Sequence, residues 1–319
     1  MGGPLLHAHF QFENAVVPTE TEVHQFTLHA ALAYYSRLTN SSGGLISDTN
    51  HALLDIWRDK SAWQKKEGES RRELYVRQIK FASSQVLKRA NNVRGIPGFL
   101  TGVETDIVDS NGKLSTYESV LRKLDIVIAS LHWRVWQGYG GGKTLPKDSK
   151  RDIIKAYVAV ARNPHVDIIG HPGVLPLSVK PLFNAEDYKP VLDAMKSNGC
   201  AFEINLTVDL ENQDNQLERD VIRLVAKEGV KISIGIDLHH LRFYNVPGVY
   251  GEYITLLNWE KAYHYHESSG FHATIKDGLT NKFIYLESLG VRSQNIINSS
   301  MDAFLRWKES RGKMVNQVP

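Results

Sequence analysis

The sequence has a single cysteine, Cys200, among its 319 residues, so no disulfide can form within the chain. It also lacks an excess of charge, because 38 Lys and Arg side chains stand against 35 Asp and Glu, a formal net charge of +3. No basic tract is longer than a few residues, which argues against a nucleic acid or a membrane as partner. Neither a secretory leader pattern nor an apolar run of about 18 residues is present. We therefore expect a cytoplasmic protein.

Short apolar, β-branched segments that end in a polar residue recur from residue 95 onward. They are FLTGVE, LDIVIASLH, VDIIGH, AFEIN and KISIGIDLH. Helical patterns separate them: STYESVLRKL, KDSKRDIIKAYVAVARN, NAEDYKPVLDAMKSNG and QLERDVIRLVAKEG. Successive segments end about 30 to 40 residues apart, which predicts parallel strands joined by right-handed crossovers. We expect an α/β barrel whose functional groups gather at the carboxyl ends of its strands.

Residues 52–92 differ from this alternation, because they are charged and helical in pattern. Their apolar positions step by three or four along one face: Tyr75, Ile79, Ala82, Val86 and Ala90. We expect a helical insertion that packs on the barrel, with a substrate lid or an oligomer contact as alternatives. Since no interdomain linker stands out, residues 1–319 are expected to form one domain.

Histidines and acids gather where the predicted strands end. In LLHAHFQF, near the start of the chain, His7 and His9 would point to the same face of a strand. The other candidates at strand ends are Glu104, His132, His171, Asp237 and His239. Imidazole nitrogens and carboxylate oxygens are ligands of Zn, Mn and Fe, and several of them together can hold two ions bridged by one carboxylate. The pattern predicts a metal centre.

The motifs HAH, GVETD, ASLHW, IGHPG and GIDLHH, in that order, resemble the motif series of the PHP (polymerase and histidinol phosphatase) family. The closing stretch LGVRSQNIINSSMDAFLRW resembles that family's C-terminal helix-turn segment, and the likeness covers most of residues 5–12 and 95–308. The resemblance implies a distorted TIM-like (β/α)7 barrel with two or three metal ions. Many members hydrolyse phosphate esters, although such a likeness implies fold more strongly than substrate.

The resemblance also implies a ligand set. The first metal would be held by His7, His9, Glu104 and Asp237, and the second by His132 and His171, with Glu104 bridging the two. We expect these two divalent ions to be Zn, Mn or Fe.

A third ion, common in the family, is expected to be absent. His239 matches one of its ligands, but Ala15 and Thr49 stand where the family has two further histidine ligands. Glu13 or His51 could rebuild that site only by meeting strict ligand distances.

A hydroxide that bridges two metal ions is the expected nucleophile. Asp237 is the expected proton shuttle, and His239 beside it is a second candidate acid for the leaving group. For a phosphate substrate, Arg134 and Arg242 follow predicted strand ends and could bind phosphate oxygens, with surface salt bridges as the alternative.

These residues predict a metal-dependent hydrolase, a phosphoesterase acting on a small phosphorylated metabolite. The alternative is a binuclear amidohydrolase-like enzyme that hydrolyses a C–N or C–O bond, because the expected ligand set also suits that chemistry. A third interpretation is a metal-binding regulator without activity. The substrate, the metal and the oligomeric state are left open by the sequence.

Overall fold

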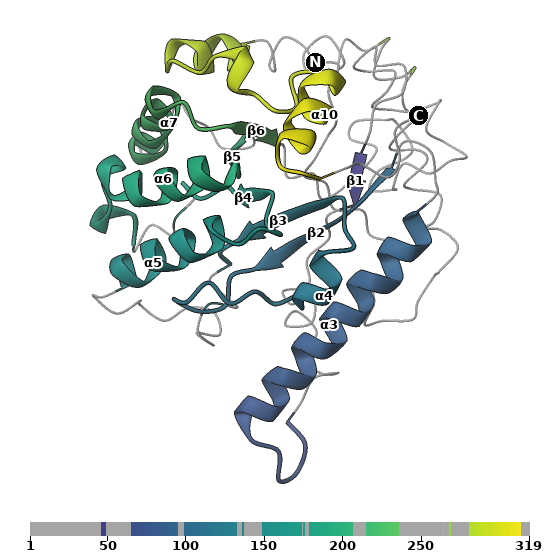
Figure 1. Ribbon diagram of the computed structural model, residues 1–319. Helices are drawn as coiled ribbons and strands as arrows, with labels where there is room; N and C mark the ends of the chain where they lie inside the picture. The colour runs from purple at the N-terminus through teal and green to yellow at the C-terminus, as the bar shows by residue number, and fades with distance from the viewer. Residues whose placement is uncertain are drawn as a thin grey trace.

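The computed structural model describes most of the predicted strand and helix units. The described residues are 65–94, 99–132, 136, 149–173, 175, 179–206, 215–235, 264, 268 and 281–313, together with the backbone of 46–48. Six parallel strands lie in chain order (Figure 1): β1 Ile46–Asp48, β2 Phe99–Asp106, β3 Ile126–Ser130, β4 Ile168–Gly170, β5 Ala201–Asn205 and β6 Ile232–Gly235. The parallel α/β arrangement predicted from the sequence is therefore confirmed. Among the described residues β1 and β6 do not pair, so the sheet is open and its closure into a barrel stays a prediction.

The helices are α3 Arg71–Val93, α4 Glu118–Leu121, α5 Ser149–Ala161, α6 Lys189–Asn198, α7 Gln216–Glu228 and α10 Met301–Ser310. Short 3-10 turns lie at Lys180–Leu182 (η2), Ala185–Tyr188 (η3) and Ser293–Asn295 (η5). The helices α6 and α7 end at Gly199 and Gly229, whose φ angles of 67° and 69° suit a residue without a side chain. None of the described helices is long and apolar enough to cross a membrane.

The helix α3 occupies the second half of the segment 52–92 that was expected to be helical and ends one residue beyond it, whereas residues 65–70 are not helical. Ser70 caps it by accepting a hydrogen bond from the Glu73 N–H, and the Glu73 carboxylate accepts one from the Ser70 N–H in return. Its predicted apolar face is buried at Ile79, Ala82, Val86 and Ala90. Whether this helix is an insertion into a single domain stays a prediction.

The helix α4 is shorter than expected, with four residues where STYESVLRKL predicted a longer helix. The residues before it are held by the sheet and by α3. The Thr105 hydroxyl donates a hydrogen bond to the Thr116 hydroxyl, and the Tyr117 N–H donates one to the Ser83 hydroxyl. Tyr117 has an extended backbone, so the helix begins only at Glu118.

The sheet is buried on both faces, which explains why its strands read as nearly continuous apolar runs. On one face, alternate residues such as Val103, Val127 and Ile169 belong to the large core beneath α5, α6 and α7 (Figure 1). On the other face, residues in the first halves of the strands form a second apolar cluster: Leu100, Ile126, Ile128, Ile168 and Ala201. The side chains Ile297, Phe304 and Trp307 cover that cluster. We call this second face, which carries Leu100 and Ile128, the inner face, and α10 covers its amino end.

A buried ionic network fixes α10 at the amino end. Asp167 is 1% exposed, and its Oδ1 lies 2.7 Å from Lys313 Nζ and 3.5 Å from both Lys308 Nζ and Arg311 Nε. Its Oδ2 accepts a hydrogen bond from the Val127 N–H at 3.0 Å, at the start of β3. Burial opposes ionisation, but the three cations prevail and hold the pKa of Asp167 below its usual value of 3.8.

We predict that Asp167→Asn lowers the free energy of unfolding at pH 7 by about 3 kcal/mol, because three cations lose their buried partner. Since the pKa is depressed in the folded state, this contribution is complete above about pH 4 and is lost as the pH falls through the folded pKa. Urea unfolding at pH 7 and at pH 3 should show the difference between the two proteins narrowing in acid. The exposed Asp193→Asn is the control, and a difference independent of pH would contradict the assignment.

Candidate metal centre

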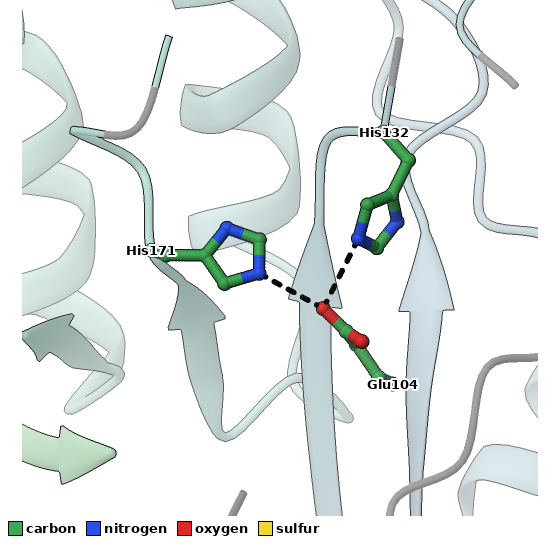
Figure 2. A group of neighbouring side chains, drawn as sticks. All are labelled: Glu104, His132 and His171. Carbon is green, nitrogen blue, oxygen red and sulfur yellow. Dashed lines mark hydrogen bonds and ion pairs between the residues drawn. The ribbon is translucent and has the colours of Figure 1, made fainter. Parts of the chain in front are cut away.

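Three predicted ligands converge at the carboxyl ends of β2, β3 and β4 (Figure 2). Glu104 lies on the inner face of β2, where its register partner on β3 is Ile128. His132 comes two residues after β3, and His171 comes directly after β4. Because these strands are neighbours and parallel, residues at their carboxyl ends meet at one edge of the sheet.

One carboxylate oxygen faces both imidazole rings. Glu104 Oε1 lies 3.1 Å from His171 Nε2 and 3.4 Å from His132 Nε2. The Glu104 side chain is fully buried, whereas the side chains of His132 and His171 are 18% and 13% exposed. The site therefore has a buried acid at its floor and two imidazoles at its solvent side.

Asp106 determines which nitrogen of His132 faces Glu104. Its Oδ1 lies 2.9 Å from His132 Nδ1, and as a carboxylate it can only accept, so the proton of the neutral ring lies on Nδ1. The lone pair of His132 Nε2 then points toward Glu104 Oε1. Two acceptors that face each other repel unless a proton or a metal ion lies between them. This arrangement suits a cation.

A hairpin beyond β2 holds Asp106 in place. The Ser115 hydroxyl donates to Asp106 Oδ2 at 3.0 Å and accepts from the Asp106 N–H at 2.9 Å. Between them the chain reverses through DSNG, where Asp109 Oδ1 accepts from the Asn111 N–H and Gly112 has a φ of 73°. A side chain on Gly112 would lie 2.7 Å from the Ala159 side chain of α5, so the turn also requires glycine for space.

The loop that carries His171 is strained and braced. His171 has a φ of 31°, the only positive φ of a residue other than glycine among those the structure describes. Such a conformation costs roughly 1–3 kcal/mol and persists only where surrounding contacts impose it. Glu203 Oε2 accepts the His171 N–H at 2.9 Å, and the Tyr188 hydroxyl donates to the Pro172 carbonyl at 2.9 Å. Burial raises the pKa of Tyr188 well above its usual value, so its hydroxyl keeps the proton that it donates.

The donor set fits a divalent ion. One atom each from Glu104, His132 and His171 lie within 4.8 Å of one another. Two atoms bound tetrahedrally at about 2.1 Å to one zinc ion lie about 3.4 Å apart, close to the separations from Glu104 Oε1. The structure brings these three residues together, and their role as metal ligands stays a prediction.

The other predicted site residues lie outside the described residues: His7, His9, Arg134, Asp237, His239 and Arg242, as do Glu13 and His51. Their roles stay predictions. Sequence reasoning assigned no role to Asp106 or Glu203. Both lie on the inner face of their strands at period-two positions, but this pattern alone does not distinguish them from other polar residues of a strand.

Fold and site together define a parallel α/β protein with a candidate metal centre at the carboxyl ends of its strands. No family model matches the chain. Curated proteins that it resembles include a probable phosphatase of Thermoanaerobacter sp. (strain X514), 39% identical over 142 residues, which are 44% of this chain and 52% of that protein. A probable phosphatase of Caldanaerobacter subterraneus subsp. tengcongensis is 36% identical over 142 residues, 44% of this chain and 50% of that protein. The chain thus spans about half the length of the curated relatives it matches.

A solved structure with some likeness is histidinol phosphate phosphatase from Lactococcus lactis subsp. lactis, complexed with zinc, L-histidinol and phosphate. It is 16% identical, with a TM-score of 0.41 and coverage of 75% of this chain and 86% of that chain.

We predict that Asp106→Asn weakens zinc binding about tenfold and Asp106→Ala up to about 100-fold, because His132 loses the partner that sets its tautomer and ring orientation. Competition with a chromophoric chelator measures the affinity. Asp109→Asn, which alters the same hairpin without contacting His132, is the matched control. Equal zinc affinity in the Asp106 variants and the wild type would refute this role.

Proposed function

We propose that this protein is a metal-dependent phosphoesterase of the PHP type that hydrolyses a small phosphorylated metabolite. The observation that carries the proposal is the position of Glu104 Oε1, within 3.4 Å of two imidazole nitrogens, one of which has its lone pair directed at that oxygen by Asp106. The similarity of part of the chain to proteins named probable phosphatases supports the choice of phosphate esters.

In this proposal the site holds two divalent ions, Zn, Mn or Fe. His7, His9 and Asp237 would complete it beside the described ligands, and the Glu104 carboxylate would serve both ions. The strand that carries His7 and His9 would help close the sheet into the distorted (β/α)7 barrel, within a single domain. We also propose a cytoplasmic location, which the single cysteine favours.

The residues of the chain have separable tasks in hydrolysis. Bound divalent ions would supply a Lewis acid for the phosphate oxygens and a water whose pKa is near neutral. Glu104, buried at the floor, places one carboxylate oxygen between the two histidines. Asp106 keeps His132 in the tautomer that presents Nε2. Asp237 would take a proton from the attacking water, and Asp237 or His239 would return one to the leaving oxygen.

We predict that Glu104→Gln lowers kcat by at least about 100-fold, equivalent to about 2.7 kcal/mol, and reduces the metal content below the two ions per chain expected of the wild type. The amide has the same shape but no charge to share between two ions. Metal analysis and turnover of phosphomonoesters with added Mn or Zn measure the two effects. Glu118→Gln is the control, because Glu118 is an exposed carboxylate that pairs with His165 at 3.1 Å.

The substrate screen should also include phosphodiesters, N-acyl compounds and lactones. Turnover of N-acyl compounds or lactones alone would replace the phosphoesterase with an amidohydrolase-like enzyme. A protein purified gently without metal, and inactive on every class, would favour a regulator.

We predict that Arg242→Ala raises the KM for a phosphomonoester by more than about tenfold, because a bidentate contact to phosphate oxygens is lost. The measurement is steady-state kinetics with saturating metal. If the KM does not change, Arg242 does not bind the phosphate.

A further inference from the structure

The backbone of His171 adopts an unfavourable conformation for two reasons. Its φ of 31° lies in a region that residues with a side chain rarely adopt. It also precedes Pro172, whose ring restricts the backbone of the residue before it. Because this backbone conformation is unfavourable by itself, contacts with neighbouring groups must stabilise it.

Glu203 is placed to hold it. The pairing of β4 with β5 ends at Ile169 and Phe202, and one residue further the two strands continue to Gly170 and Glu203. The next N–H of the chain, that of His171, donates to Glu203 Oε2 at 2.9 Å. A side-chain carboxylate therefore continues the contact between the two strands just beyond the last paired residues.

The inner face is shaped around this carboxylate. Glu203 is 1% exposed, and a carboxylate is buried only where hydrogen bonds compensate the lost water. A Cβ on Gly235 would overlap Glu203 Oε1. Gly235 does not have a positive φ, so the backbone conformation does not require glycine there. Glycine is needed because a side chain would overlap the Glu203 carboxylate. The glycine leaves room for the Glu203 carboxylate between the ends of β4 and β6.

We infer that Glu203 is a positioning residue: it fixes the His171 backbone so that His171 Nε2 reaches Glu104 Oε1. This inference rests on the proposed metal centre. It differs from the role of Asp106, which holds the ring of His132 through Nδ1, because Glu203 holds a main-chain N–H. Metal affinity would then depend on the reach of the Glu203 side chain more than on its charge.

Two substitutions separate the effect of the length of the Glu203 side chain from the effect of its charge. Glu203→Asp keeps the buried charge but withdraws the acceptor by one methylene, and we expect zinc affinity to fall about 10- to 100-fold. Glu203→Gln loses the charge but keeps an oxygen within reach, and we expect affinity within about threefold of the wild type. Zinc affinity is measured on the full chain by competition with a chromophoric chelator. The reverse order of the two variants, or no effect of Glu203→Asp, would overturn the inference.

The matched control is Glu218→Asp. Glu218 is a buried carboxylate, 5% exposed, that packs against Gly173 in the same loop but pairs with Lys180 at 2.7 Å. We expect zinc affinity to remain unchanged. An equal loss in this variant would mean that general loop packing, not the hydrogen bond to His171, sets the affinity.

A double-mutant cycle tests whether Glu203 acts through His171. In a His171→Ala background, Glu203→Asp should reduce zinc affinity by less than about twofold, because the imidazole that it positions is gone. Additive losses would show that Glu203 acts independently of His171 and would overturn the inference.

A crystal structure of metal-free Glu203→Asp separates this inference from the proposed function. We expect His171 to leave its positive φ and the 3.1 Å approach to Glu104 to open. An unchanged His171 refutes the positioning role even if the wild type binds metal. A wild type that binds no zinc refutes the metal centre, while the crystal structure still decides whether Glu203 holds His171.

Discussion

The carboxyl end of the sheet is organised by the fully buried Glu104 carboxylate, whose Oε1 is shared by two imidazoles. Burying such a charge costs several kcal/mol unless it is paired. Hydrogen bonds from the two rings compensate it only partly, because Asp106 directs the His132 lone pair, rather than an N–H, toward the same oxygen. A divalent cation at this point would satisfy the carboxylate and both rings together. A bound cation would therefore satisfy the polar atoms of this site better than the hydrogen bonds within the site do.

The inner face of the sheet has two tiers with opposite chemistry. At the amino end, apolar side chains are covered by α10, and Asp167 is neutralised by three cations of that helix and the residues after it. At the carboxyl end, the same face carries three buried acids, Glu104, Asp106 and Glu203. Carboxylate oxygens are ligands of divalent cations, so the apolar amino end closes the face and the carboxyl end presents donors to a cation.

The sequence was informative where burial dictates pattern. Both faces of the sheet are covered, so the strands are largely apolar, and the spacing between these apolar segments predicted the common edge at which Glu104, His132 and His171 lie. It was uninformative where a contact depends on register. Asp106 and Glu203 look like ordinary polar residues of a strand, and their reach to His132 and His171 follows from neighbours 26 and 32 residues away. The short α4 was missed for the same reason, because Thr116 and Tyr117 are held by β2 and α3.

Each histidine of the site is held from a flanking strand. His132, after β3, is held by Asp106 of β2, and His171, after β4, is held by Glu203 of β5. Four consecutive strands thus contribute to one coordination geometry through their mutual register. Because side chains alternate along a strand, a slip of one residue would move an acid from the inner face to the opposite face. The register that buries the apolar core is therefore also the register that assembles the site, and a substitution in the core that shifts one strand would weaken metal binding without touching a ligand.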